Sequence, residues 1–372
     1  MKCIMAGFAN KYKRLKKSTR TNISAYGLVI ILFVVALTMQ STGAISNSLS
    51  GQLVPICTYI VMALSLNLTV GFLGELSLGH AGFMSVGAFS GVIAAVSLQS
   101  SMGSGPLLLL VAMIIGGLFA GIAGLIIGIP VLRLRGDYLA IVTLAFGEII
   151  KNIMNCLYVG VDMGGLHFSL KSVNDLGMEN GKIIINGPQG AVGIPKLATL
   201  TAGFILILFA LFIVLNLINS KTGRAVTAIR DNRIAAESVG IGVTKYKLAT
   251  FIISAVLAGM AGALYAMNFS TVAAKKFDFN TSILILVFVV LGGMGNIVGS
   301  IVATTILYML PELLREFADY RMLLYAIVLI IVMIATNSEK AIQFRDSVMA
   351  KLSSKKRKSQ NDSETKEAVN NE

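Results

Sequence analysis

The chain has few of the residues from which soluble enzymes build their sites. Only 13% of its 372 residues are charged, and it holds two histidines and three cysteines. A soluble domain carries about 25% charged residues, so this composition excludes an ordinary soluble fold. Two histidines nearly exclude histidine-based metal or acid–base clusters. Cys3, Cys57 and Cys156 lie far apart, which indicates neither a disulfide framework nor a metal site.

Motifs of nucleotide-binding and hydrolytic enzymes are also missing. The chain has no GxxxxGK[ST] phosphate loop, no GxSxG elbow, no HExxH pair and no CxxC pair. We therefore expect no catalytic residues, no metal site and no ATP binding by a phosphate loop. A net charge of +13 would suit a nucleic-acid partner. However, the basic residues lie beside apolar runs, where membrane topology explains them, so nucleic acid is not expected.

Apolar runs of about 20 residues recur along most of the chain, which is 55% hydrophobic with a mean hydropathy of +0.80. Because a helix needs about 20 apolar residues to cross a bilayer, the sequence predicts an all-α polytopic membrane protein. The predicted spans are 24–42, 52–71, 78–98, 106–129, 139–159, 198–218, 248–267 and 321–337, together with the longer run 281–310.

The run 281–310 contains a predicted helix break. Thirty residues would form a helix of about 45 Å, which is too long for one straight span. Its middle reads GGMGNIVG (292–299), and Gly292, Gly293 and Gly295 favour a break. We expect two short or re-entrant segments that meet at the glycine break (292–296). The total is then about ten membrane segments.

Basic residues predict the orientation of the chain. Residues 1–23, the loop 219–247 and the tail 338–372 are rich in Lys and Arg, which marks cytoplasmic segments. We expect a transmembrane domain over 24–337 in a cytoplasmic membrane, with both termini inside and a largely disordered tail. The largest outer loop, about 160–197, is large enough for a small cap, a hairpin or a partner-contact surface.

The charged loop (219–247) lies between two apolar runs. It carries six basic residues against only Asp231 and Glu237. Its centre, from about 225 to 239, predicts one short helix that ends at Gly240. A short charged helix between two spans is typical of a docking surface for a cytoplasmic partner.

The glycine-rich turn (67–83) reads NLTVGFLGELSLGHAGF and contains Asn67, Ser77, Gly79 and His80. Such a stretch can unwind at membrane depth where it lines a polar cavity. A half-helix that starts near Ser77 would offer backbone N–H groups to a substrate carboxylate. The alternatives are a tight turn whose glycines serve close packing and, for His80, a hydrogen-bonded histidine inside the bundle.

A polar stripe is predicted on the span 139–159. Glu148, Asn152 and Asn155 share one helical face, and Glu148 falls near the middle of the membrane. A charge at that depth costs several kcal/mol unless it is paired or solvated. The stripe either faces a substrate pathway or holds the bundle through a Glu148–Lys151 pair.

Four segments resemble the permease subunits of bacterial ABC importers for branched-chain amino acids, the LivM-type branch. They are LNLTVGFLGELSLGHAGFMSVGA (66–88), RLRGDYLAIVTLAFGEIIK (133–151), TGRAVTAIRDNRIAAESVGIGVTKYKLATFIISAVLAGMAGALYA (222–266) and SILILVFVVLGGMGNIVGSIVA (282–303). The likeness covers roughly 51–336. It implies the permease fold of these importers and the uptake of leucine, isoleucine or valine.

The resemblance also implies partners and roles. The partners would be a second, homologous permease, two ATPase subunits that bind ATP and Mg²⁺, and an extracytoplasmic substrate-binding protein. The residues that match the family's coupling loop are Arg224, Arg230, Asp231, Ala235, Glu237 and Gly240. Glu75 departs from the family signature, in which an uncharged amide is expected. Alternatives are a permease for urea or another small amino acid or amide, and an ion-coupled secondary transporter that uses Glu148.

Overall fold

The computed structural model describes residues 17–43, 47–103, 105–134, 136–162, 165–178, 181–316 and 320–337. The predictions for the first 16 residues and for the tail 338–372 fall outside the described residues. The chain folds as two compact units, Met1–Met309 and Leu310–Glu372.

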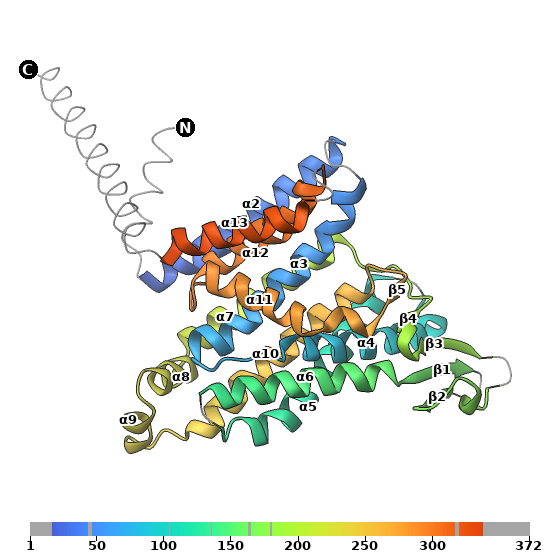
Figure 1. Cartoon of the computed structure of the whole chain (residues 1–372), viewed down its shortest axis with the longest axis horizontal. Coiled ribbons are helices and arrows are strands. Elements are labelled where there is room, and N and C mark those ends of the chain that lie inside the picture. The colour runs from blue at the N-terminus through green and yellow to red at the C-terminus, as the bar shows by residue number, and fades with distance from the viewer. Residues whose placement is uncertain are drawn as a thin grey trace, which may run out of the picture. The chain divides into compact units, whose positions relative to one another are not determined.

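Unit 1 is built mainly from long apolar helices (Figure 1). Their bounds are α2 (Lys17–Ser41), α3 (Asn47–Asn67), α4 (His80–Met102), α5 (Pro106–Val131), α6 (Asp137–Asn155), α7 (Leu200–Asn219), α10 (Val243–Ala266) and α11 (Phe279–Gly292), followed by α12 (Ile297–Leu313), which runs into unit 2. Among the described residues, six helices are long and apolar enough to cross a membrane, namely those in 22–41, 49–72, 80–99, 106–131, 200–219 and 243–266. The polytopic helical fold is confirmed, whereas the count of ten spans is not.

Helices α4, α5 and α10 form the tightest part of unit 1 because glycines remove the side chains between them. A Cβ on Gly87 of α4 would collide with the backbone of Gly259 in α10. A Cβ on Gly116 of α5 would lie 2.7 Å from the carbonyl oxygen of Gly87. Small residues allow this close backbone contact between membrane helices, which is the role that four-residue glycine spacing predicts.

A five-stranded antiparallel sheet lies over the predicted outer loop, for which a hairpin was one of the alternatives, and extends beyond it to β5. Its strands run in the order β2-β1-β3-β4-β5. The bounds are β1 (Tyr158–Asp162), β2 (Gly165–Ser169), β3 (Lys182–Asn186), β4 (Ala191–Val192) and β5 (Thr271–Val272), with short 3₁₀ turns η2 (Asn174–Leu176), η3 (Gly187–Gln189) and η4 (Ala274–Phe277). The predicted span 139–159 is therefore too long, because α6 ends at Asn155 and β1 begins at Tyr158.

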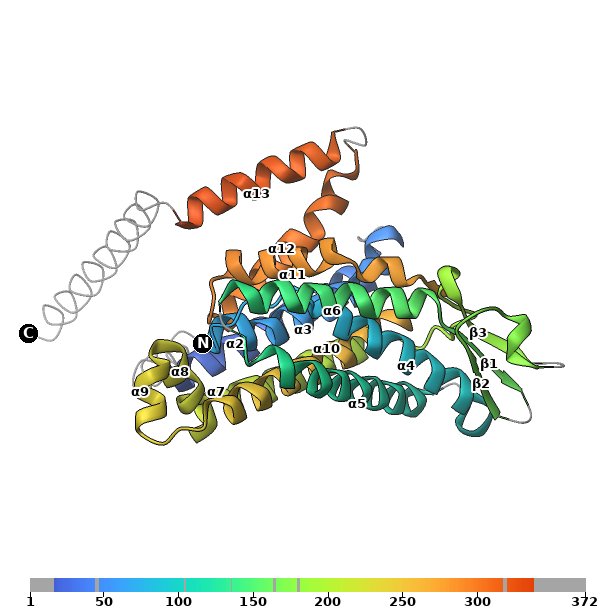
Figure 2. The same cartoon turned by 60° about the horizontal axis from the view of Figure 1, so that its bottom comes forward.

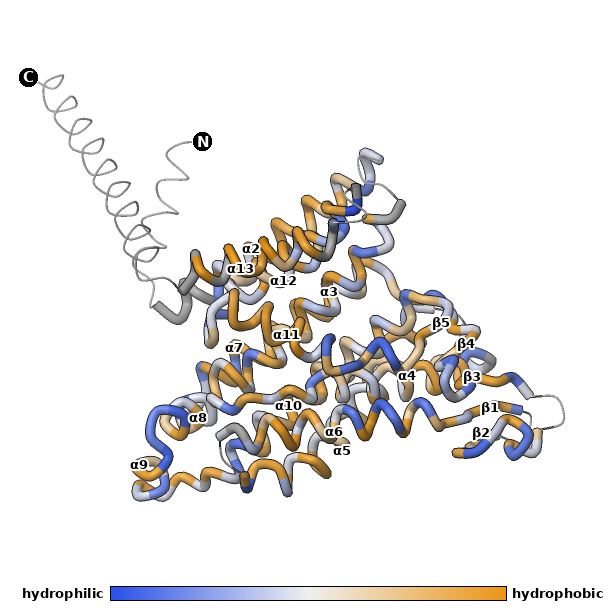
Figure 3. The backbone as a smooth tube through the Cα atoms, viewed as in Figure 1, coloured by the Kyte–Doolittle hydropathy of each residue, from blue (hydrophilic) through white to orange (hydrophobic). Residues whose placement is uncertain are grey.

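The sheet and the charged loop lie at opposite ends of unit 1. Two further helices, α8 (Lys221–Asp231) and α9 (Arg233–Ser238), form the end that carries the charged loop. The views in Figures 1 and 2 agree on this arrangement. Figure 3 shows hydrophilic stretches around α8 and α9 and around the strands, with mostly hydrophobic helices between them.

The run 281–310 is divided at the glycine break. Helix α11 ends at Gly292 and α12 begins at Ile297. Between them, Gly293 has φ of 90° and Gly295 has φ of 79°, a conformation that glycine adopts without steric cost. The two helices have 14 and 17 residues, or about 21 and 25 Å, so each is shorter than a 30 Å hydrocarbon core.

The described part of unit 2 consists of the last turn of α12, the 3₁₀ turn η5 (Leu314–Glu316) and α13 (Arg321–Asn337). An ion pair of 3.3 Å joins Arg315 to Glu312 within this short stretch. Helix α13 has the bounds of the predicted last apolar segment, 321–337.

Candidate functional site

The charged loop contains two helices where the sequence analysis predicts one. Asn232 separates α8 from α9 because its backbone is extended, with φ of −154° and ψ of 104°. Its side-chain oxygen accepts a hydrogen bond of 3.0 Å from the N–H of Ala235 and so caps α9. Asparagine is a favoured N-cap residue, so the sequence contained the signal for this corner.

A small apolar core of its own holds the charged loop together. Ile229 of α8, Ala236 of α9 and Val243 of α10 are buried against one another, with Ile241 and Tyr246 packed beside them. The two short helices therefore form a fixed attachment at the end of α7 and α10.

The outer face of the charged loop exposes both charges and large apolar side chains. All six of the predicted coupling residues are exposed, namely Arg224, Arg230, Asp231, Ala235, Glu237 and Gly240. Ile234 and Val239 are 79% and 74% exposed, more than any other large apolar side chain of the described residues. They stand among the charged side chains of the loop. The sequence analysis missed both.

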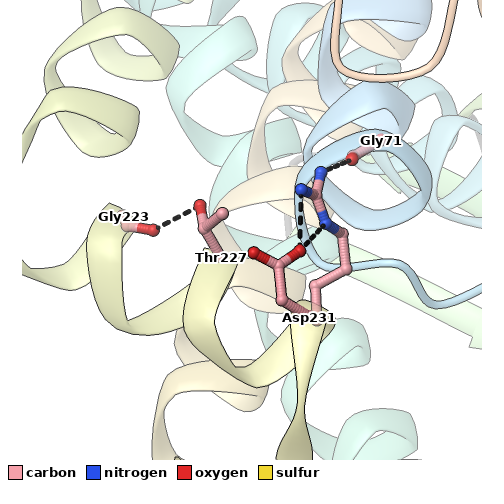
Figure 4. A network of polar contacts seen from close by, with 5 residues as sticks. Gly71, Gly223, Thr227 and Asp231 are labelled. Carbon is pink, nitrogen blue, oxygen red and sulfur yellow. Dashed lines mark hydrogen bonds and ion pairs between the residues drawn. The ribbon is translucent and has the colours of Figure 1, made fainter.

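One of these coupling residues, Arg230, bonds to the glycine-rich turn and to its own neighbour, and Figure 4 labels these two partners, Gly71 and Asp231. Its Nη1 donates a hydrogen bond of 3.0 Å to the carbonyl oxygen of Gly71. Its Nε and Nη2 donate to Oδ1 of Asp231 at 3.1 and 3.0 Å. Arg230 therefore joins the charged loop to the glycine-rich turn.

The glycine-rich turn departs from α-helical geometry directly after α3. The chain forms a π-helical turn, η1 (Leu68–Phe72), in which the N–H of Leu73 bonds to the carbonyl of Leu68 at 3.1 Å. It then runs without helix until α4 begins at His80, three residues after the predicted start at Ser77. π-Helical turns occur frequently at functional sites.

An ion pair between Glu75 and Lys247 ties the same turn to α10. The side chains are only 15% and 6% exposed. Glu75, which departs from the expected amide, thus has a specific partner at the start of α10. The two residues are 172 positions apart, which is why the sequence analysis did not pair them.

Asn67 connects the turn to the glycine break. Its Oδ1 accepts a hydrogen bond of 2.8 Å from the N–H of Gly295, and its Nδ2 donates one of 3.0 Å to Oγ of Ser300. Asn67 is 1% exposed and Ser300 is fully buried. The predicted pathway residue Asn67 is therefore engaged in the interior of this one chain.

The start of α4 is also well bonded. The Nε2 atom of His80 lies 2.7 Å from Oγ of Ser65, so His80 is a hydrogen-bonded histidine inside the bundle. The N–H groups of Leu78 and Ala81 donate to side-chain hydroxyls of Thr143 and Ser282, both at 3.1 Å. These two N–H groups are thus occupied.

Two further predicted residues lie in the same buried region. A Cβ on Gly79 would collide with the backbone carbonyl of Thr143, which shows how closely the turn packs on α6. The buried hydroxyl of Ser77 has no hydrogen-bond partner among the described residues. Ser77 stays a predicted residue of the substrate pathway.

The polar stripe of α6 lies apart from these buried residues. Glu148 forms an ion pair with Lys151, and their side chains are 34% and 19% exposed. Asn152, one turn further, is exposed. The structure therefore places Asn67, Ser77, Gly79 and His80 inside the bundle and leaves Glu148 and Asn152 on its outer side.

These features define a polytopic membrane protein of the transport type, in which a charged loop contacts a buried polar turn. A family model for the permease component of branched-chain amino acid transport systems matches residues 48–336, and the chain belongs to this family. This result confirms the resemblance that the four sequence segments indicated.

Three relatives show how the likeness is distributed. The chain is 36% identical, over 291 residues and 74% of its length, to the LivM permease proteins of the high-affinity branched-chain amino acid transport systems of Salmonella typhimurium and Escherichia coli. The match spans 66% of each of them, slightly less than two thirds. The nucleoside permease protein NupC of Lactococcus lactis is 28% identical over 216 residues, 55% of this chain and 64% of the relative. No solved structure matches the chain.

Proposed function

We propose that the chain is the membrane-spanning subunit of an ATP-driven importer and that α8 and α9 dock on a separate ATPase subunit. The observation that carries this proposal is the exposure of Ile234 and Val239, 79% and 74%, within the charged loop. An apolar centre inside a polar rim is the common arrangement of a protein interface. The basic bias of the loop places it at the cytoplasmic face, where ATP is available.

The proposed assembly contains four kinds of component. A second, homologous permease would complete the membrane pathway, and two ATPase subunits would bind ATP and Mg²⁺, for which this chain has no motif. An extracytoplasmic substrate-binding protein would deliver the solute at the opposite face, where the sheet lies. Both termini of this chain would be cytoplasmic.

The proposed substrates are leucine, isoleucine and valine, on the strength of the family and of the two LivM relatives. A path between two permeases would pass the outer side of α6, where Glu148 and Asn152 are accessible. A second candidate is another small polar solute, because the match extends to a nucleoside permease protein.

Co-purification from the native host tests the docking role. The tagged chain, extracted in mild detergent, should retain ATPase subunits that carry a phosphate loop. The variants Ile234→Ser and Val239→Ser should weaken their binding about tenfold or more, because each removes a central apolar anchor. Thr244→Ala, an exposed change in the same loop, serves as the matched control. Undiminished ATPase binding by both serine variants would count against docking at α8 and α9.

A further inference from the structure

Gly71 lies between the charged loop and the glycine break. Its carbonyl oxygen accepts the hydrogen bond from Arg230, 159 residues away in the sequence. On its other side, a Cβ at Gly71 would collide with the backbone N of Gly295 and would lie 2.9 Å from the Cα of that residue. One residue without a side chain therefore separates two segments that the sequence places far apart.

The charged loop holds the glycine-rich turn at two further points. The stem of Arg230 packs on Gly74, where an added Cβ would lie 2.6 Å from Cγ of Arg230. Glu75, the next residue, forms its ion pair with Lys247 at the start of α10. Residues 71–75 are thus attached to both helices that flank α9, so they should follow any movement of the loop.

Asn67 makes the corresponding attachment to the break. Its side chain binds Gly295 on one side and Ser300 of α12 on the other. The bond to Ser300 is buried and the bond to Gly295 is partly buried, and an unpaired polar group is costly away from water. Because loss of these hydrogen bonds is costly, a movement of the glycine-rich turn should shift residues 292–296 with it. Gly293 and Gly295, both at positive φ, are residues that can absorb a change in backbone angle.

We propose that these contacts form a mechanical relay, in which displacement of α8 is carried through Gly71 and Asn67 to the glycine break and changes the angle between α11 and α12. The relay rests on the proposed function, since it requires an ATPase that moves the charged loop. Arg230, Lys247 and Asn67 act in it as positioning residues. Alternatively, a displacement of the charged loop is transmitted through its covalent connections to α7 and α10, without involving the glycine break.

A spin label at the break tests the relay in the assembled complex. Met294 lies within the break and is 62% exposed, so Met294→Cys offers an accessible site for the label. All other cysteines of the complex are first replaced. Addition of a non-hydrolysable ATP analogue should change the label's mobility in the parent complex. Arg230→Met retains an apolar stem on Gly74 but loses the donor to Gly71. In this variant, the fraction of complexes whose label changes mobility on addition of nucleotide should fall about tenfold, as expected for loss of one hydrogen bond from a charged donor.

Two additional variants separate the relay from simple docking. The double variant Glu75→Leu/Lys247→Met removes the second attachment without leaving a buried charge, and neither residue lies on the exposed face of α8 or α9. It should also reduce the response at Met294. Lys245→Met removes an exposed positive charge two residues before Lys247 and should respond like the parent.

The outcomes distinguish the two proposals. The relay would be overturned if both the Arg230 variant and the double variant bind the ATPase and respond at residue 294 like the parent. The docking role would then remain intact. An ATPase that does not bind the parent chain would overturn the docking role and the relay together. A bound ATPase with a lost response in both variants, but not in Lys245→Met, is the result we expect.

Discussion

The side chain of Asn67 accepts a hydrogen bond of 2.8 Å from the backbone N–H of Gly295, across 228 positions of sequence. This contact fixes the end of α3 against the loop that separates α11 from α12. A carboxamide suits this position because it can accept and donate at the same time, and the same amide donates to Ser300.

Replacing Asn67 with leucine tests how much this amide contributes to the stability of the fold. The change leaves the partly buried N–H of Gly295 without its partner, which should lower the free energy of unfolding by about 1 kcal/mol or more. Thermal unfolding of the purified protein in detergent measures the loss. The control is Asn268→Leu, because the hydrogen bond of Asn268 to Gly51 is exposed and measures 3.3 Å. Equal melting temperatures for the two variants would contradict the prediction.

The losses of stability caused by substituting Glu75 and Lys247 should be strongly non-additive. Lys247→Met alone leaves the carboxylate of Glu75 in a site that is 15% exposed, and loss of one partner of such a pair costs about 3 kcal/mol. The double variant Glu75→Leu/Lys247→Met removes both charges and should be more stable than the single variant. A double-mutant cycle on the melting temperature measures the coupling. Additive losses would mean that the two charges do not interact.

Gly79 should not accept a side chain. Its Cβ would collide with the backbone carbonyl of Thr143, and backbone cannot turn away as a flexible side chain can. We expect Gly79→Ala to force the start of α4 away from α6 and to destabilise the protein by about 1–3 kcal/mol. Gly27→Ala in α2 is the control, because nothing lies within 4 Å of its added Cβ. Thermal unfolding of the two variants, side by side, decides the question.

Glu148→Gln should separate transport from stability. The carboxylate is 34% exposed and pairs with Lys151 on its own helix, so the pair contributes at most about 1 kcal/mol. We therefore expect an unchanged melting temperature together with reduced uptake of radiolabelled leucine by the reconstituted complex. Parent-like uptake would remove the outer side of α6 from the proposed pathway.

The sequence predicted best those features that depend on neighbouring residues. Apolar length placed the helices, and three glycines within four positions placed the break between α11 and α12. The corner in the charged loop was missed although its signal is local. Asn232 caps α9, and the analysis treated the surrounding residues as one continuous helix.

Long-range pairings lay beyond the reach of sequence patterns. The sheet includes β5, whose two residues come after α10, so no local alternation identifies it. Asn67 and Glu75, and Arg230 in its bond to Gly71, have partners 159 to 233 positions away. The hydroxyls of Thr143 and Ser282 carry no local signal of their partners, and only the fold brings them to the start of α4.

The backbone contacts among α4, α5 and α10 have a consequence for how the protein can change shape. Where Gly87, Gly116 and Gly259 bring three backbones together, no flexible side chains remain to adjust if one helix slides past another. We expect these three helices to move together as one rigid body. Alternation of the pathway would then fall to the elements at its margin, namely α6, which meets α4 through Gly79 and Gly82, and the α11–α12 hairpin with its glycine loop.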